Sequence, residues 1–336
     1  VTPAFAAPTG NVAFTFFRND TCEGVGTAAG SVALNGATPG VAHPSLPSGA
    51  LAPGSYAFRA SWPGDTNYTG DTSDCEPFTV GKGRSTVTTT LHKADHSVVA
   101  IGGSVPLGTV MHDLATVAVT PTFAAPTGNV AFTFFTNDTC EGSGVAAGSV
   151  ALNGATPGVA HPSDSTAALA PGSYAFRASW PGDTNYTGDT SDCEPFTVGK
   201  GRSTVTTTLH KADHSVVAIG GSVPLGTVMH DLATVAVTPT FAAPTGNVAF
   251  TFFTNDTCEG SGTAAGSVAL NGATPGVAHP SSSTAALAAG SYAFRASWPG
   301  DTNYTGDTSD CEPFTVDKAN LTLTTTIHTD SPDADL

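Results

Sequence analysis

Short runs of alternating apolar and polar residues make up most of the chain. In residues 11–17, NVAFTFF, the side chains of Val12, Phe14 and Phe16 fall on one side of an extended backbone. The larger side chains of residues 56–62, YAFRASW, also fall on one side. Such runs, bounded by Gly, Pro, Asn and Asp, are typical of half-buried antiparallel strands, and no window has a helical period. We therefore expect an all-β protein.

The same series of runs occurs three times along the chain. VTPAFAAPTGNVAFTFF begins at Val1, and near-copies begin at Val119 and Val237, so the repeat is 118 residues long. Further strand candidates, namely STVTTTL, LATVAVTP, GSVAL, STAALA and EPFTV, bring each repeat to about seven strands. A period of this length matches one domain per repeat and is too long for a solenoid unit.

We predict three tandem Ig-like β-sandwich domains of about seven strands each, arranged as a linear array. The predicted domains are residues 1–80, which lack the opening strands of a repeat, residues 84–198 and residues 202–316. Residues 317–336 repeat the opening strand of a domain and continue into a tail.

Three sequence features resemble those of a known family, the bacterial Ig-like repeat domains of secreted and surface proteins. They are PTGNVAF at 8–14, LAPGSYAFRASWPGDTNY at 51–68 and the Thr-rich STVTTTL at 85–91. The resemblance covers essentially the whole chain. It implies that the Pro-Thr-Gly turn leads into one core strand and the Leu-Ala-x-Gly corner into another. It implies the fold and leaves the function open, because the family serves as spacer, stalk and adhesive module alike.

Composition and charge exclude several classes of function. The net charge is −16 with only 11 Lys and Arg residues, which argues against binding to nucleic acid or to anionic membrane surfaces. No apolar run approaches the ~20 residues of a membrane span. No signal peptide is visible at the start, which indicates a mature chain or a fragment. No nucleophile elbow, phosphate-binding glycine loop or catalytic carboxylate pair stands out, so we expect no enzyme and no cofactor.

The cysteines point to an extracellular location. An even number in fixed register, with no C-x-x-C motif and no neighbouring histidine, indicates disulfides formed outside the reducing cytosol. We prefer bridges within each repeat, although bridges from the second cysteine of one repeat to the first of the next are the alternative. The preferred pairs are Cys22–Cys75, Cys140–Cys193 and Cys258–Cys311.

Asn-x-Thr triplets occur in every repeat and have two interpretations. They are N-glycosylation acceptors if the host carries the machinery, and the protein is then a glycoprotein. The alternative is turn chemistry, because Asn side chains bond to the backbone of turns. The triplets begin at Asn19, Asn67, Asn137, Asn185, Asn255, Asn303 and Asn320.

One loop of the first repeat gathers acidic residues, namely Asp65, Asp71, Asp74 and Glu76. Carboxylates on a loop can hold Ca²⁺. The spacing does not match an EF-hand, so a solvated acidic loop is the preferred interpretation and Ca²⁺ is a weak candidate.

Histidines cluster in the sequence HKADH, with His92 and His96 four residues apart and His112 further on. On a helix this spacing would form a metal-binding face, but the segment is predicted as strand and turn. We therefore favour a surface or interdomain role over a zinc site and expect no metal. The C-terminal copy of the segment keeps only His328.

Near-identical domains in series favour an extracellular structural protein at the cell surface, forming a stalk, fibre or filament. The alternative is the repeat region of an adhesin that binds carbohydrate or a protein partner.

The two ends of the chain suggest how copies associate. The first repeat lacks the counterpart of residues 84–118, while Leu321, Leu323 and Ile327 share one side of the tail strand. One explanation is head-to-tail assembly of copies, in which the tail strand of one chain completes the first repeat of the next by β-augmentation. The other explanation is that the chain was cut from a longer array.

Overall fold

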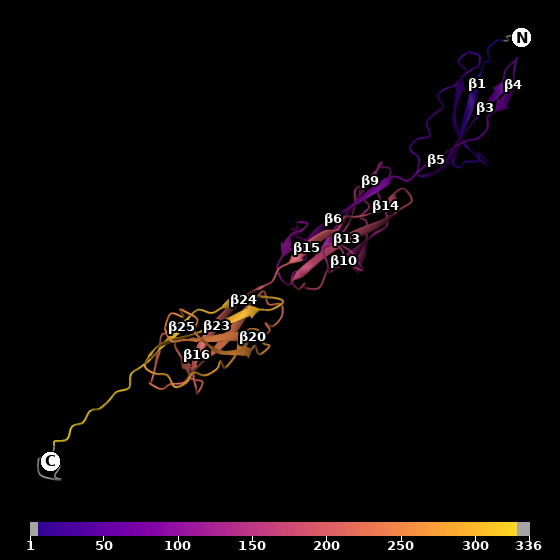
Figure 1. The fold of residues 1–336 in the computed structure, drawn as a ribbon. Coiled ribbons are helices and arrows are strands. Elements are labelled where there is room, and N and C mark those ends of the chain that lie inside the picture. Colours follow the sequence, from indigo (N-terminus) through magenta and orange to yellow (C-terminus); the bar gives the residue numbers. More distant parts are fainter. Residues whose placement is uncertain (1–5, 328–336) are drawn as a thin grey trace. The chain divides into compact units, whose positions relative to one another are not determined.

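The structure is a computed structural model that describes residues 6–327 (Figure 1). In that range the backbone forms 25 strands and no helix, and the described residues contain no helical segment with the length and hydropathy of a membrane span. The strands build sandwich-like sheets in repeated units. The predicted all-β, Ig-like tandem fold is therefore confirmed.

The third repeat consists of two sheets. One has the strand order β17-β16-β19-β22, and the other has the order β18-β25-β23-β20-β21, with β24 paired to β23. The strands β18 and β25 are parallel, and the other pairs are antiparallel. The bounds are β16 (Arg202–Lys211), β17 (Val216–Val217), β18 (Ser222–Val223), β19 (Met229–Thr238), β20 (Asn247–Phe253), β21 (Thr263–Ala269), β22 (Gly276–Ala278), β23 (Gly290–Gly300), β24 (Thr305–Thr308) and β25 (Glu312–Val316).

The core of this repeat is built from alternate residues of both sheets. Val205 and Leu209 of β16 are 4% and 0% exposed, while Phe250 of β20 and Trp298 of β23 are each 1% exposed. Burying an aliphatic or aromatic side chain of this size stabilises a fold by about 1.5–3 kcal/mol. The apolar sides predicted for NVAFTFF and YAFRASW are thus the core sides of their strands.

The second repeat contains the same strands. The strands β6 and β9 pair along ten residues, as β16 and β19 do. The bounds are β6 (Arg84–Lys93), β7 (Val98–Val99), β8 (Ser104–Val105), β9 (Met111–Thr120), β10 (Asn129–Phe135), β11 (Val145–Ala151), β12 (Gly158–Ala160), β13 (Gly172–Gly182), β14 (Thr187–Thr190) and β15 (Glu194–Val198). Residue contacts divide the chain into two compact units, and the short segments 103–110 and 167–173 group with the third repeat. The domain boundaries at 84–198 and 202–316 therefore remain predictions.

The first repeat forms a single sheet in the described residues, with the order β2-β1-β3-β4 and β5 paired to β3. Its aromatic side is incompletely covered, because Phe14, Phe58 and Phe78 are only partly buried. The corresponding Phe250, in the third repeat, is fully buried. The bounds are β1 (Asn11–Phe17), β2 (Thr27–Ala33), β3 (Gly54–Gly64), β4 (Thr69–Thr72) and β5 (Glu76–Val80).

One strand prediction was wrong. The stretch STAALA, residues 165–170, has no strand, and the short strand β12 lies just before it instead. The stretch is fixed by other bonds, because Thr166 donates its amide to the carbonyl of Met111 and accepts the Met111 amide at its hydroxyl. The apolar run therefore does not pair with a neighbouring strand as part of a β-sheet.

Candidate metal centre

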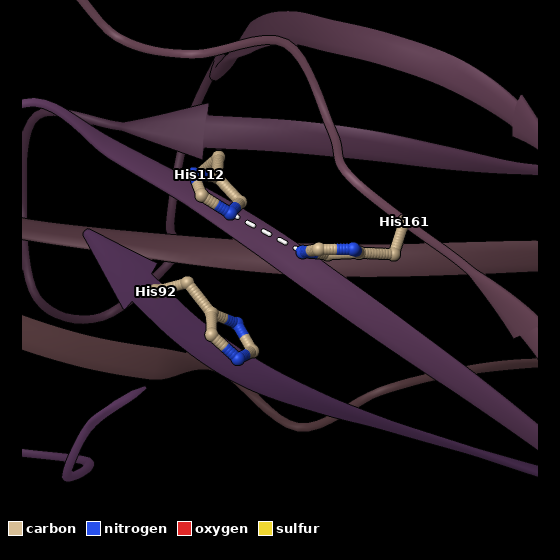
Figure 2. A group of neighbouring side chains, drawn as sticks. All are labelled: His92, His112 and His161. Carbon is tan, nitrogen blue, oxygen red and sulfur yellow. Dashed lines mark hydrogen bonds between the residues drawn. The ribbon is translucent and has the colours of Figure 1, made fainter. Parts of the chain in front are cut away.

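Three histidines of the second repeat lie on three segments that meet at one end of its four-stranded sheet. His92 on β6 is directly opposite His112 on β9 in the antiparallel ladder. At the other edge of β9, Ala160 of β12 pairs with Ala115, so the following residue, His161, reaches the same end. Figure 2 shows the three rings gathered in one place from these separate segments.

The ring nitrogens of this histidine cluster are close together. The Nε2 atoms of His112 and His161 are 3.2 Å apart. One ring nitrogen from each of His92, His112 and His161 lies within 4.8 Å of the other two. The His92 and His112 rings are stacked, with centroids 5.6 Å apart and 8° between their planes. A single small cation can therefore be approached by all three side chains.

A fourth imidazole stands at the rim of the cluster. His96 lies in the turn after β6, and its ring centroid is 4.9 Å from that of His112 and 5.2 Å from that of His161. Its backbone has φ 63°, in the left-handed region, and its amide donates to the carbonyl of Lys93. His96 is exposed, whereas His112 is only 2% exposed.

Burial favours the neutral rings of His112 and His161. Burial lowers the pKa of His112, and the neighbouring His161, His96 and His92 lower it further. Burial also lowers the pKa of His161, with the same effect from His92 and His96. Nδ1 of His92 is 2.9 Å from the carbonyl oxygen of Thr90. In a neutral ring that nitrogen carries the proton and donates to the carbonyl, which leaves a lone pair on Nε2.

The third repeat holds an equivalent histidine cluster. The Nε2 atoms of His230 and His279 are again 3.2 Å apart. Ring nitrogens of His210, His230 and His279 lie within 4.8 Å of one another, and His214 occupies the rim position.

The sequence revealed these histidines only in part. The sequence predicts a surface or interdomain role for His92, His96 and His112, but His92 and His112 are 9% and 2% exposed, so a surface location is wrong for these two. His161 was missed because it is 49 residues from His112 and reaches it only through the pairing of β9 with β12. The His-Pro dipeptide, which recurs in each repeat, was the available signal. His328 lies outside the described residues.

Asp113, which follows His112 in the sequence, forms a buried carboxyl pair with Glu194. Asp113 is 0% exposed and Glu194 is 4% exposed. Burial and the nearby Glu194 together raise the pKa of Asp113 to about 8, and burial also raises the pKa of Glu194. One oxygen of each carboxyl has no hydrogen-bond partner among the described residues. No sequence pattern links these two residues, because they are far apart along the chain.

Each repeat is closed by one disulfide, and the pairing is the preferred one within repeats. The bridges are Cys22–Cys75, Cys140–Cys193 and Cys258–Cys311, each with a sequence separation of 53 residues. Cys140 packs with Phe135 and Ala175 in a small cluster, and the guanidinium of Arg177 lies 5.3 Å from the centre of the Phe135 ring. By the chain-entropy model, closing a loop of this length stabilises the fold by about 4 kcal/mol.

The Asn-x-Thr triplets take part in turns. Oδ1 of Asn137 accepts hydrogen bonds from the amide and hydroxyl of Thr139, and Nδ2 of Asn137 donates to the carbonyl of Glu141. Asn19 and Asn255 make the same contacts, so a glycan at these positions would be attached to a nitrogen that already donates a hydrogen bond in the turn. Glycosylation of the seven asparagines remains a prediction.

In the acidic loop of the first repeat, the carboxylate of Asp65 accepts hydrogen bonds that hold the loop in place. Oδ2 of Asp65 accepts the amide and hydroxyl of Thr9, and Oδ1 accepts the amides of Asn67 and Tyr68. These bonds join the Pro-Thr-Gly turn at residues 8–10 to the loop GDTNY at residues 64–68, both of which lie in the stretches that carry the family resemblance. Among the described residues, Asp65, Asp71, Asp74 and Glu76 do not form a group that could share an ion.

Comparisons with known proteins leave the function open. No protein-family model and no curated protein matches the chain. The C-terminal domain of the Streptococcus agalactiae AgI/II polypeptide BspA aligns with 68% of this chain and 100% of its own, at 10% identity and a TM-score of 0.23. Latent PorU from Porphyromonas gingivalis aligns with 92% of this chain and 30% of its own, at 13% identity and a TM-score of 0.23. The T6 backbone pilin of Streptococcus pyogenes aligns with 94% of this chain and 81% of its own, at 10% identity and a TM-score of 0.17. Likenesses this weak carry no argument about function.

Proposed function

We propose that the protein is an extracellular structural protein whose tandem Ig-like repeats form a stalk, fibre or filament at a cell surface. The observation that carries the proposal is the disulfide in every repeat. Bridges of this kind persist outside the reducing cytosol and stabilise small β-sandwiches against unfolding. Near-identical repeats also suit a role in which length matters more than a unique binding site.

The state of the thiols in the source cells tests this proposal. Whole cells are treated with a membrane-permeant maleimide of known mass before lysis. The chain is then isolated, and its mass is measured by mass spectrometry. We expect no label on the six cysteines without reduction, and six labels after unfolding and reduction. Labels on Cys140 or Cys193 without reduction would place the protein in a reducing compartment and contradict the proposal.

The alternative function is the repeat region of an adhesin for carbohydrate or a protein partner. A groove of about 300 Å³ on the third repeat, lined by Phe252, Thr263 and Leu287 among others, is the surface feature that favours it. Binding of the intact chain to a glycan array, lost on Thr263→Arg, would support the adhesin over the structural role.

We also propose that copies of the chain associate head to tail. The tail residues Leu323 and Ile327 correspond by the repeat to Val87 and Leu91, which are 4% and 0% exposed on β6. In the tail Leu323 and Ile327 are 84% and 75% exposed, and Leu321 is 91% exposed. The partly covered aromatic side of the first repeat is a surface on which such a strand can pack.

The strand pairing limits how strong this association can be. The tail resembles strand β16, which forms its long ladder with β19. The strand β16 forms no ladder with the other sheet of the third repeat, which contains β23. A donated tail strand would therefore gain face packing without a full ladder, unless a counterpart of β19 is also supplied. Sedimentation of the intact chain and of a variant lacking 319–336 tests the association. We expect concentration-dependent oligomers that disappear on deletion, and monomers from the intact chain would refute it.

A further inference from the structure

We propose that each histidine cluster binds one divalent late transition-metal ion of the Zn²⁺ class. Three ring nitrogens would bind the ion directly, and the rim histidine would complete a fourth position. The ligands are His92, His112, His161 and His96 in the second repeat, and His210, His230, His279 and His214 in the third. This inference is independent of the structural function proposed above.

The ligand set defines the class of metal. Imidazole nitrogen binds Zn²⁺, Cu²⁺ and Ni²⁺ well, whereas Ca²⁺ and Mg²⁺ require oxygen ligands. Among the described residues, the clustered groups consist of histidine alone. The site therefore excludes hard cations by its chemistry.

The spacing of the nitrogens fits a tetrahedral ion. Zn²⁺ holds histidine nitrogens at about 2.0–2.1 Å, so two nitrogens on neighbouring corners of a tetrahedron are about 3.3 Å apart. The Nε2 atoms of His112 and His161 are already 3.2 Å apart. The remaining distances, up to 4.8 Å, need to shorten by no more than ~1.5 Å, which side-chain rotation supplies.

The outer contacts orient one ligand toward the ion. Metal-binding histidines usually donate their second ring N–H to a carbonyl or carboxylate, which fixes the tautomer. Nδ1 of His92 lies 2.9 Å from the Thr90 carbonyl, and Nδ1 of His210 lies 2.9 Å from the Thr208 carbonyl. In both clusters Nε2 is then free to bind.

The backbone of the rim histidine supports the fourth position. His96 and His214 have φ of 63° and 64°, a region that Gly or Asn occupies at lower cost. A histidine at such a position of the turn places an imidazole beside the other rings, where a smaller residue would place none. Four nitrogens make a closed, structural site and not an open, catalytic one.

A bound ion would connect segments that are distant in the sequence. In the second repeat these are the end of β6, the start of β9 and the residue that follows β12. Because the ion binds the folded state, it raises the free energy of unfolding with increasing metal concentration.

Calorimetric titration of the intact chain with Zn²⁺, after treatment with a chelator, tests the proposal. We expect two ions per chain. His112→Ala should leave one ion, and His112→Ala combined with His230→Ala should abolish tight binding. His43→Ala is the matched control, because His43 is the first-repeat counterpart of His161 and is exposed, outside both clusters. It should leave both ions bound.

A second measurement covers the case in which a variant of a buried histidine fails to fold. The ring of His161 is only half-buried, so His161→Gln should leave the fold intact. It should weaken Zn²⁺ binding at that site by more than roughly 10–100-fold, the effect of losing an outer-shell partner. Co²⁺ in place of Zn²⁺ should give the visible absorption of a tetrahedral nitrogen site, and His96→Ala together with His214→Ala should change its intensity. No Zn²⁺ uptake by the folded chain, or uptake that His161→Gln and His279→Gln leave unchanged, would overturn the proposal.

Discussion

Thr127 and Asp183 are joined by two hydrogen bonds across 56 residues. The amide and the hydroxyl of Thr127 donate to Oδ2 of Asp183 at 3.0 and 3.1 Å. Oδ1 of the same carboxylate accepts the amides of Asn185 and Tyr186. One side chain thus satisfies four donors and joins the turn before β10 to the loop after β13.

We predict that Asp183→Ala destabilises the second repeat by roughly 2–4 kcal/mol, because hydrogen bonds to a charged group contribute about 1.5–3 kcal/mol and the released amides lose their acceptor. Urea unfolding of the intact chain, followed by hydrogen exchange in β13, measures the change. Asp192→Ala is the control, since this exposed residue lies in the next loop. Equal effects of the two substitutions would show that the carboxylate of Asp183 has no special role.

Stability should fall as the pH rises from about 6.5 to 8. Burial raises the pKa of Asp231 to about 8 and that of Glu312 to about 7, so the folded state holds protons that the unfolded state has lost. The stability from this proton is greatest at low pH and is lost as the pH passes the folded pKa. Burial lowers the pKa of His230, whose ordinary value is 6.5, and this works in the opposite direction only at lower pH.

The decline should be up to about 1.4 kcal/mol per pH unit for each proton involved. Urea unfolding at several pH values between these limits measures it. The double variant Asp113→Asn, Asp231→Asn removes the titrating aspartates in both repeats and should reduce the slope, leaving the contribution of Glu312. A slope that this variant leaves unchanged would assign the pH dependence to other groups.

Corresponding tryptophans should differ in importance between repeats. Trp298 is 1% exposed between two sheets, so Trp298→Ala should cost about 3–5 kcal/mol. Trp62 is only half-buried on the single sheet of the first repeat, so Trp62→Ala should lower the free energy of unfolding by less. Hydrogen exchange of β23 and β3, each compared with the unmodified chain, measures both. A larger loss of protection from Trp62→Ala would mean that the first repeat has a complete core.

The fold was predictable because its determinants are local. Alternation in NVAFTFF and YAFRASW identifies core strands, and the fixed register of the cysteines limits the disulfides to two sensible schemes. STAALA misled because apolar alternation alone does not distinguish a strand from a segment held by bonds such as that of Thr166 to Met111.

The site was much less predictable. His112 and His161, or Asp113 and Glu194, approach one another only because particular strands pair or face each other. Sequence spacing records neither the pairing of β9 with β12 nor which residues the two sheets enclose.

Mechanical unfolding of single intact chains tests the structural role most directly. We expect the second and third repeats to unfold in separate, similar events under force. The disulfide keeps a loop of 53 residues closed in each, so reduction should lengthen each event by at most about 180 Å, at about 3.4 Å per residue. Chains that extend smoothly without discrete events, or events whose length is unchanged by reduction, would contradict a structural protein built from disulfide-closed repeats.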